Sequence, residues 1–255
     1  MAESREVLIV EDERVVLKVA GMALAAQGIG FQEAIDVQSA TALLESTRFK
    51  VVLTDLKLPG DSGFEILSMA QSITPPPQVI IITGYATIEN ALQSFQQGAF
   101  DFVPKPFDVD ELTSVAERAL RFALQSDRTT QTPTDRFFLG RHSWAWLDPD
   151  GSATLGVAET VAGVTGELED IECLKSGDHT IQGDCFCRLT AGDGLTHRVW
   201  APLSGRVILQ NSAIVQDPDL INRDPFAAGW IARVIPNRPD EELKNLRQPQ
   251  ISASG

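Results

Sequence analysis

The stretch VVLTD, residues 51–55, decides the fold of the first half of the chain. Four apolar or β-branched residues are typical of a short buried strand, and the acidic Asp55 follows them at once. Other segments repeat this form, and we predict strands in VLIV at 7–10, VIIIT at 79–83 and FDFV at 100–103, with a weaker one in IGFQEA around Phe31. All of these runs are too short to span a membrane.

Amphipathic stretches separate the apolar runs. Apolar residues recur at helical spacing in three of them: Val16, Ala20 and Leu24 before Gly28; Ile88, Ala91, Leu92 and Phe95 before Gly98; and Leu112, Val115, Ala116 and Ala119. Asp108 and Glu111 form a capping box in front of the last one. Five βα units in succession predict an α/β domain in which helices wrap a parallel sheet.

Polar residues follow the predicted strands at the edge where an open parallel sheet binds ligands. Glu11 and Asp12 follow the first strand, Asp55 the third, Thr83 the fourth and Lys105 the fifth. Three carboxylates in one pocket repel one another strongly unless a cation is present. A hard divalent ion such as Mg²⁺ fits this arrangement, because it favours a few carboxylates together with a backbone oxygen and waters.

The remaining groups at this edge suit phosphoryl transfer onto a carboxylate. Lys105 adds a movable positive charge, Thr83 adds a hydroxyl, and Gly84 leaves room for a tetrahedral group. Such a transfer needs in-line access and neutralised oxygens.

Residues 5 to about 125 resemble the receiver domain of two-component response regulators. The resemblance rests on the acidic pair in VEDE, on DLKLPGDSG, on TGY and on FVPKPF. It implies a flavodoxin-like (βα)5 fold and a phosphoacceptor that is not an enzyme beyond self-catalysed phosphoryl transfer and autodephosphorylation. Glu11 replaces the commoner aspartate, and Phe102 lacks the hydroxyl of a tyrosine.

The resemblance also implies a role for each residue at the predicted edge. Asp55 accepts phosphate from a sensor histidine kinase or a phosphotransfer protein. Mg²⁺ is held by Glu11, Asp12, Asp55 and the backbone carbonyl of Lys57. Thr83 and Lys105 contact the phosphoryl group. Phe102 takes the place of the switch aromatic residue.

Composition limits the partners and the compartment. Residues 1–125 carry 9 Lys and Arg against 17 Asp and Glu, and the remainder carries 12 against 18, so neither half suits a phosphate backbone. The three cysteines are an odd number, and no basic and then apolar leader precedes the first strand. These features predict a reduced, cytoplasmic protein that binds no DNA and no membrane.

The second half has a different pattern. After the receiver-like domain at 1–125, a polar linker is expected at 126–134, and a second domain at 135–255. Strands are predicted in HSWAWL, TLGVA, DCFCRL, HRVWAP, GRVILQN and GWIARVI, with helices around 159–164 and 240–246. This pattern predicts a small β-rich barrel or sandwich, and it contains no helix-turn-helix and no Gly-rich phosphate loop.

Three phrases of the second half resemble the glycine cleavage H protein, a lipoyl carrier with a barrel-sandwich hybrid fold. They are HSWAWLDPDGSATLGVAETVAGVTGELEDIE, APLSGRVILQN and DPDLINRDPFAAGWIARV. In that family the lipoylated lysine lies eight residues before the proline matched here by Pro202, and this position is Gly194. No lysine occurs between Lys175 and Lys244, so we expect the hairpin without lipoate.

Two interpretations of the missing lysine compete. In the first, the carrier fold is reused as a protein recognition module. In the second, Cys185 and Cys187 replace the dithiol, although residues two apart in a strand are poorly placed for a disulfide. A zinc site built from His142, His179, His197 and the cysteines is disfavoured because the spacing fits no familiar pattern.

The sequence therefore predicts a response regulator that acts through protein contact, either with an unknown downstream protein or with a second copy through its receiver domain. The first alternative is an inactive carrier mimic that docks on a lipoyl-handling or redox enzyme complex. The second alternative is a phosphate sink with an inert passenger domain.

Overall fold

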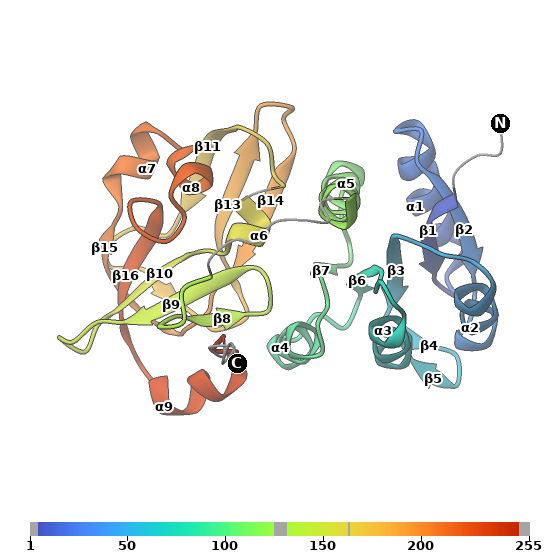
Figure 1. Cartoon of the computed structure of the whole chain (residues 1–255), viewed down its shortest axis with the longest axis horizontal. Helices are drawn as coiled ribbons and strands as arrows, with labels where there is room; N and C mark the ends of the chain where they lie inside the picture. The colour runs from blue at the N-terminus through green and yellow to red at the C-terminus, as the bar shows by residue number, and fades with distance from the viewer. Residues whose placement is uncertain (1–4, 125–131, 163, 250–255) are drawn as a thin grey trace, which may run out of the picture. The chain divides into compact units, whose positions relative to one another are not determined.

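The computed structural model describes residues 5–124, 132–162 and 164–249. The chain divides into two compact units, residues 1–126 and 127–255, and each unit is described by itself (Figure 1). Residues 126–131 of the expected linker lie outside the described residues.

A five-stranded sheet forms the centre of the first unit (Figure 1). Its order is β2-β1-β3-β6-β7, and the neighbouring strands run parallel. The strands are β1 (Arg5–Val10), β2 (Gly30–Ala34), β3 (Val51–Asp55), β6 (Gln78–Thr83) and β7 (Asp101–Pro104). All five residues of β3 are buried, as a central strand covered on both faces requires. The predicted strands, including the weaker one around Phe31, are confirmed.

Five helices cover this sheet: α1 (Arg14–Ala26), α2 (Val37–Ser46), α3 (Gly63–Ser72), α4 (Ile88–Gln96) and α5 (Val109–Leu124). Side chains of α1 and α5 pack with β1, β3 and β6 in one core cluster. Asp36 caps α2 by accepting a hydrogen bond from the Ser39 N–H at 2.7 Å, and Thr87 caps α4 in the same way. Ile88, predicted to face inward, is 37% exposed because it opens the first turn of α4.

The second unit contains two antiparallel sheets. The larger has the order β12-β15-β16-β10-β9-β8, and the smaller has the order β11-β13-β14. The strands are β8 (Phe137–Leu139), β9 (Ser143–Leu147), β10 (Ala153–Val157), β11 (Leu168–Cys173), β12 (His179–Thr180), β13 (Cys185–Ala191), β14 (Thr196–Trp200), β15 (Gly205–Gln210) and β16 (Trp230–Pro236). One core cluster contains buried residues of both sheets, so the sheets enclose a common core.

Short helices complete the second unit: α6 (Glu159–Ala162), α7 (Ser212–Gln216), α8 (Leu220–Arg223), α9 (Pro239–Glu242) and the 3₁₀ helix η1 (Leu243–Asn245). The six predicted strands and the two predicted helical regions are present, whereas β8, β11, β12, α7 and α8 were not predicted. Gln182, which precedes β13, anchors the terminal helices by donating to the Glu242 carbonyl at 2.9 Å.

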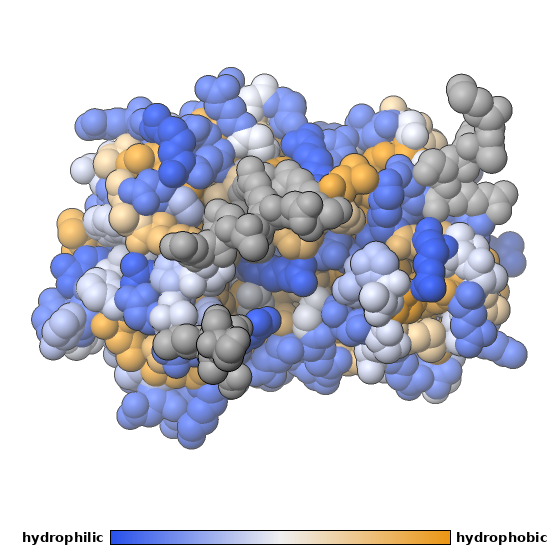
Figure 2. Space-filling model, viewed as in Figure 1, coloured by the Kyte–Doolittle hydropathy of each residue, from blue (hydrophilic) through white to orange (hydrophobic). Residues whose placement is uncertain are grey.

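Among the described residues, no helix has the length and apolar content that a membrane crossing requires. Polar and apolar side chains are interspersed on the face shown in Figure 2.

Candidate functional site

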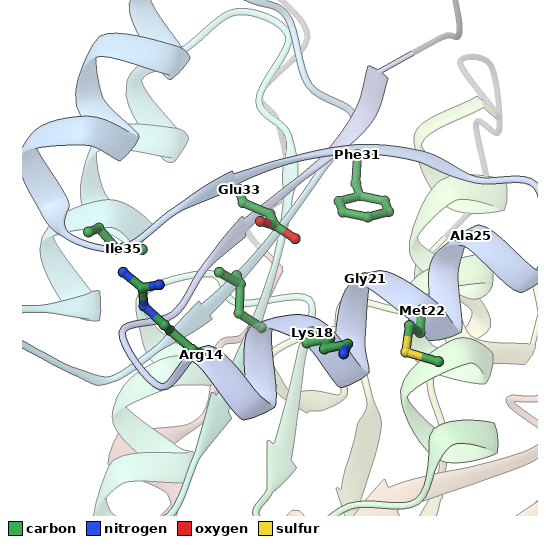
Figure 3. Close-up of a pocket in the computed structure, with 9 residues that line it drawn as sticks. Arg14, Lys18, Gly21, Met22, Ala25, Phe31, Glu33 and Ile35 are labelled. Carbon is green, nitrogen blue, oxygen red and sulfur yellow. The ribbon is translucent and has the colours of Figure 1, made fainter.

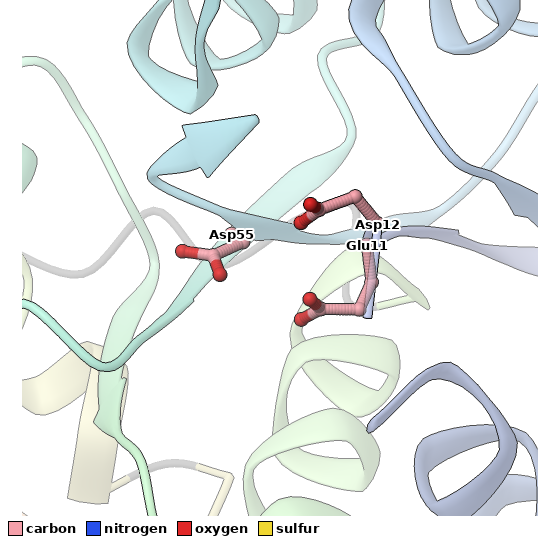
Figure 4. Close-up of side chains that lie close together, drawn as sticks. All are labelled: Glu11, Asp12 and Asp55. Atoms are coloured by element: carbon pink, nitrogen blue, oxygen red, sulfur yellow. The ribbon is translucent and has the colours of Figure 1, made fainter. Parts of the chain in front are cut away.

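An acidic cluster lies at the carboxyl edge of the first sheet (Figure 4). Glu11 and Asp12 follow β1, and Asp55 is the last residue of β3. One carboxylate oxygen from each of the three residues lies within 4.8 Å of the other two. Glu11 and Asp55 are buried, whereas Asp12 is exposed. The prediction that adjacent parallel strands bring these acids together is therefore met by the geometry.

Lys105 lies between the two buried carboxylates. Its Nζ is 2.7 Å from Glu11 Oε2, 2.7 Å from Asp55 Oδ2 and 3.3 Å from Glu13 Oε1. The lysine side chain is only 12% exposed, so its ammonium group reaches the acids from within the fold. One fixed cation thus offsets part of the negative charge that burial concentrates here.

The pKa values of the cluster reflect two opposing effects. Burial raises the pKa of Glu11, and the hydrogen bond from Lys105 only partly reverses this. Burial alone would lower the pKa of Lys105, but its hydrogen bonds and charge interactions with Asp55 and Glu11 outweigh that effect and raise it. The lysine therefore remains charged at neutral pH.

Backbone groups hold Asp55 in place. Its Oδ1 accepts a hydrogen bond from the Lys57 N–H at 3.0 Å. Lys57 begins a small hairpin formed by β4 (Lys57–Leu58) and β5 (Asp61–Ser62), after which α3 starts at Gly63. A Cβ atom on Gly63 would lie 2.0 Å from the Asp55 carbonyl oxygen. Glycine at position 63 is therefore required for helix α3 to start directly against the end of β3.

Thr83 and Tyr85 stand at the end of the neighbouring strand, β6. Thr83 is fully buried, and its Oγ1 accepts a hydrogen bond from the Tyr85 N–H at 3.1 Å. Lys57 Nζ donates to the Tyr85 hydroxyl at 2.6 Å and lies 4.4 Å from the ring centroid. Tyr85 is 53% exposed, so this lysine–tyrosine pair lies at the surface beside the Asp55 loop.

The last predicted residue, Phe102, is buried in β7. The contacts that were not predicted include those of Glu13 with Lys105 and of Tyr85 with Lys57. In the sequence, Glu13 is the third acid of VEDE and Tyr85 is the tyrosine of TGY, but neither motif indicates which lysine the residue contacts.

The predicted hairpin of the second unit is formed by β13 and β14. Its turn is closed by a hydrogen bond from the Gly194 N–H to the Ala191 carbonyl at 2.8 Å, and Asp193 accepts one from Leu195. Gly194 is exposed and has φ +81°, a conformation that favours glycine. No atom lies within 4 Å of the place a Cβ would take there.

A separate cavity of about 530 Å³ lies between α1 and β2 (Figure 3). Arg14, Lys18, Met22, Phe31 and Glu33 are among the residues that line it. None of the three clustered acids is part of this lining.

Two families match the two units. Residues 7–117 match the family described as "Response regulator receiver domain", and residues 136–253 match "Glycine cleavage H-protein". The predicted combination of a flavodoxin-like (βα)5 domain and an H-protein-like β domain is thereby confirmed.

Curated relatives match each half. The response regulator protein PilR of Pseudomonas aeruginosa is 32% identical over 136 residues, which are 53% of this chain and 30% of PilR. The regulatory protein AtoC of Escherichia coli K12 is 30% identical over 178 residues, 70% of this chain and 38% of AtoC. The chain thus spans less than two fifths of either regulator.

The second half aligns with H proteins. A Thermococcus kodakarensis protein described as "Probable glycine cleavage system H protein" is 32% identical over 117 residues, 46% of this chain and 86% of that protein. Among solved structures, the H protein of Mycobacterium marinum matches with 27% identity and a TM-score of 0.39, covering 42% of this chain and 87% of that one. The NtrX receiver domain of Brucella abortus matches with 33% identity and a TM-score of 0.43, covering 45% and 98%. The chain therefore carries a response regulator receiver domain in its first unit and belongs, through its second, to the glycine cleavage H-protein family.

Proposed function

We propose that the protein is a response regulator phosphorylated on Asp55, and that its H-like unit signals by contact with another protein rather than by binding DNA. The observation that carries the proposal is the position of Asp55, which lies beside two further acids and within 2.7 Å of the Lys105 ammonium group. The phosphate donor is a sensor histidine kinase or a phosphotransfer protein.

The donor set fits Mg²⁺. Three carboxylates converge, two of them are buried, and the fold already places the ammonium group of Lys105 between the two buried ones. In the proposal Glu11, Asp12, Asp55 and the backbone carbonyl of Lys57 hold the ion. A bound Mg²⁺ neutralises charge on the transferred phosphoryl oxygens.

The chain's own residues position the reacting groups. An Asp55 carboxylate oxygen forms the new O–P bond as the N–P bond to the donor histidine breaks, and the Lys57 N–H orients that carboxylate. Lys105 keeps a positive charge next to the phosphoryl oxygens. The Thr83 hydroxyl supplies a further contact to the phosphoryl group, and Phe102, which is already buried in β7, takes the place of the switch aromatic residue.

The H-like unit provides the output in this proposal. No lysine occurs between Lys175 and Lys244, and the exposed tip residue Gly194 has no side chain that could carry lipoate. Both halves of the chain are acidic, and this favours a protein partner over nucleic acid. The proposal also includes pairing with a second copy of the chain through the receiver unit.

Phosphorylation is tested by incubating the full chain with phosphoramidate and Mg²⁺ and measuring intact mass. We expect one added phosphoryl group in the wild type and in Glu45→Gln, which changes an exposed acid of α2. We expect none in Asp55→Asn, and none in the wild type when a chelator removes Mg²⁺. An equal addition in Asp55→Asn would contradict the assignment.

A second candidate function follows from the family match of residues 136–253. An H-like unit without its lysine could dock as an inactive mimic on a lipoyl-handling or redox enzyme complex. This role predicts docking that is the same in the wild type and in Asp55→Asn. A phosphate sink predicts rapid loss of the phosphoryl group and no stable partner.

A further inference from the structure

Three free cysteines gather on two neighbouring strands of the smaller sheet in the second unit. Cys173 is the last residue of β11, and Cys185 and Cys187 lie at the start of β13. Figure 1 labels both strands. The two strands are antiparallel, and Cys173 lies directly opposite Cys187. From the sequence, Cys185 and Cys187 were the pair considered as a dithiol because they are two residues apart. The pairing of Cys173 with Cys187 could not be predicted, because it depends on the register between the two strands.

The hydrogen-bond pattern defines the type of this pair. The N–H of Leu174 donates to the Phe186 carbonyl at 3.3 Å. Leu174 follows Cys173, and Phe186 precedes Cys187, so this bond lies beside the cysteine pair. In an antiparallel ladder such a neighbouring bond means that Cys173 and Cys187 are a non-hydrogen-bonded pair. In pairs of this type the Cα atoms are about 4.5 Å apart and the side chains are close. Disulfides span Cα separations of roughly 4.4–6.8 Å. The backbone at positions 173 and 187 therefore suits a disulfide.

Both side chains point to the same side of the sheet. Cys187 is 2% exposed and belongs to the core cluster, and Cys173 packs against that cluster. Cys185 lies elsewhere in the ladder, because the β13–β14 register shifts between it and Cys187. Its Sγ donates to the Cys187 backbone carbonyl at 3.4 Å. Cys185 is thus the thiol that this geometry leaves outside the pair.

We propose that Cys173 and Cys187 are a site of oxidation by hydrogen peroxide, at which a cross-strand disulfide forms while Cys185 stays reduced. The disulfide links β11 to β13, the strand that leads to the hairpin tip. It fixes the base of this hairpin without involving the phosphorylation site of the first unit.

The reaction takes place in two balanced steps. The Cys173 thiolate attacks one oxygen of hydrogen peroxide, so an S–O bond forms, the O–O bond breaks, and hydroxide leaves and takes up a proton as water. The Cys187 thiolate then attacks the Cys173 sulfur; an S–S bond forms, the S–O bond breaks, and a second water is released. The two sulfurs lose two electrons, and the peroxide gains them.

The order of the steps follows from exposure. Cys173 is half-buried, and its Sγ accepts a hydrogen bond from Gln210 Nε2 at 3.0 Å, which supports the thiolate. Cys187 is buried, so it meets the sulfenic acid of Cys173 rather than the peroxide itself. Burial raises the pKa of both thiols, so oxidation is slow at neutral pH and faster in alkaline buffer.

The test oxidises the full chain with hydrogen peroxide at pH 8.5, quenches it with catalase and blocks free thiols under denaturing conditions. Trypsin cleaves after Arg141, Lys175 and Arg188, so a Cys173 disulfide joins peptide 142–175 to peptide 176–188. Because the second peptide holds both Cys185 and Cys187, Cys185→Ser identifies the partner. We expect the joined peptides in the wild type and in Cys185→Ser, and none in Cys187→Ala or Cys173→Ala.

Two further measurements accompany the peptide map. The free thiols of the oxidised wild type should fall from three to one, and the melting temperature of the second unit should rise by roughly 5 °C in the wild type and in Cys185→Ser. Dithiothreitol should reverse both effects. The proposal is overturned by a disulfide that requires Cys185, by sulfinic acid without a cross-link, or by cross-links between chains. It is also overturned if the native chain keeps three free thiols under a treatment that oxidises the urea-unfolded chain.

Discussion

At the scale of single residues, Lys105 balances the charge of the acidic cluster. Lys105→Met removes the cation between Glu11 and Asp55 but keeps most of the apolar stem. In chelator we expect the free energy of unfolding of the first unit to fall by about 2 kcal/mol, because two buried carboxylates lose their partner. Urea denaturation with and without Mg²⁺ measures this change, and part of the loss should be recovered when Mg²⁺ is added.

The matched control is Lys50→Met. Lys50 forms an ion pair with Glu6, but its side chain is 38% exposed, so water already screens the pair. We expect a change under about 1 kcal/mol and no dependence on Mg²⁺. An equal loss of unfolding free energy in Lys50→Met and Lys105→Met would show that Lys105 stabilises the acidic cluster no more than a surface ion pair does.

The cysteines should differ from free cysteine in their response to pH. Burial raises the pKa of Cys173 and Cys185, and it raises that of Cys187 well above the ordinary value of 9.0. Because the thiolate is the reactive form, alkylation of the native chain by iodoacetamide should be slower than in urea, and its rate should still be rising above pH 9. A rate in the native chain that levels off at lower pH than in urea would contradict these directions.

Sequence alone could place Asp55 and the two acids after β1, because each directly follows an apolar strand and parallel strands end at one edge. It could not predict that Glu13 and Asp55 share one lysine, since Lys105 reaches them across 92 and 50 positions of the chain. Such contacts depend on the register of the sheet and on side-chain direction.

At the scale of elements, the start of α3 against β3 determines where Asp55 sits. Gly63→Ala would place a Cβ atom 2.0 Å from the Asp55 carbonyl oxygen, and backbone must move to relieve it. We expect a loss of about 3 kcal/mol in urea denaturation and reduced phosphorylation of Asp55. Gly84→Ala is the control for stability, because no atom lies within 4 Å of its added Cβ. An unchanged stability for Gly63→Ala would refute the tight start of the helix.

The β13–β14 hairpin allows a test of the expectation that its tip carries no lipoate because it has no lysine. Gly194→Lys places an amine at an exposed turn with open space around it, and its positive φ costs on the order of 1 kcal/mol. We expect a lipoate–protein ligase to add one lipoyl group to the variant and none to the wild type, as read by intact mass. A folded variant that stays unmodified would show that the tip is no longer presented as a carrier.

Strand prediction worked where apolar and β-branched residues make up most of a strand. In β3, VVLTD, four such residues precede Asp55, whereas β11, LEDIEC, contains three acids among six residues and shows no clear alternation. Strand β12 is only two residues long and gives no period at all. The Cys173–Cys187 pairing was therefore out of reach, because the strand that carries Cys173 was itself not predicted.

At the scale of the whole molecule, the chain joins a response regulator receiver unit to a unit that matches the glycine cleavage H protein. The formal net charge is −14, and both halves contribute to it. We expect this acidic balance to favour protein partners with basic surfaces over nucleic acid. We propose that phosphorylation of Asp55 controls which protein the chain binds.

We would first perform affinity capture from a native cell extract, with the full chain as bait in Mg²⁺ and beryllofluoride, followed by mass spectrometry. Beryllofluoride stands in for the phosphoryl group on Asp55, and Asp55→Ala treated identically is the control. We expect a partner that is enriched with the loaded wild type and absent with Asp55→Ala. The same partners with both baits, or none with either, would contradict phosphorylation-gated binding.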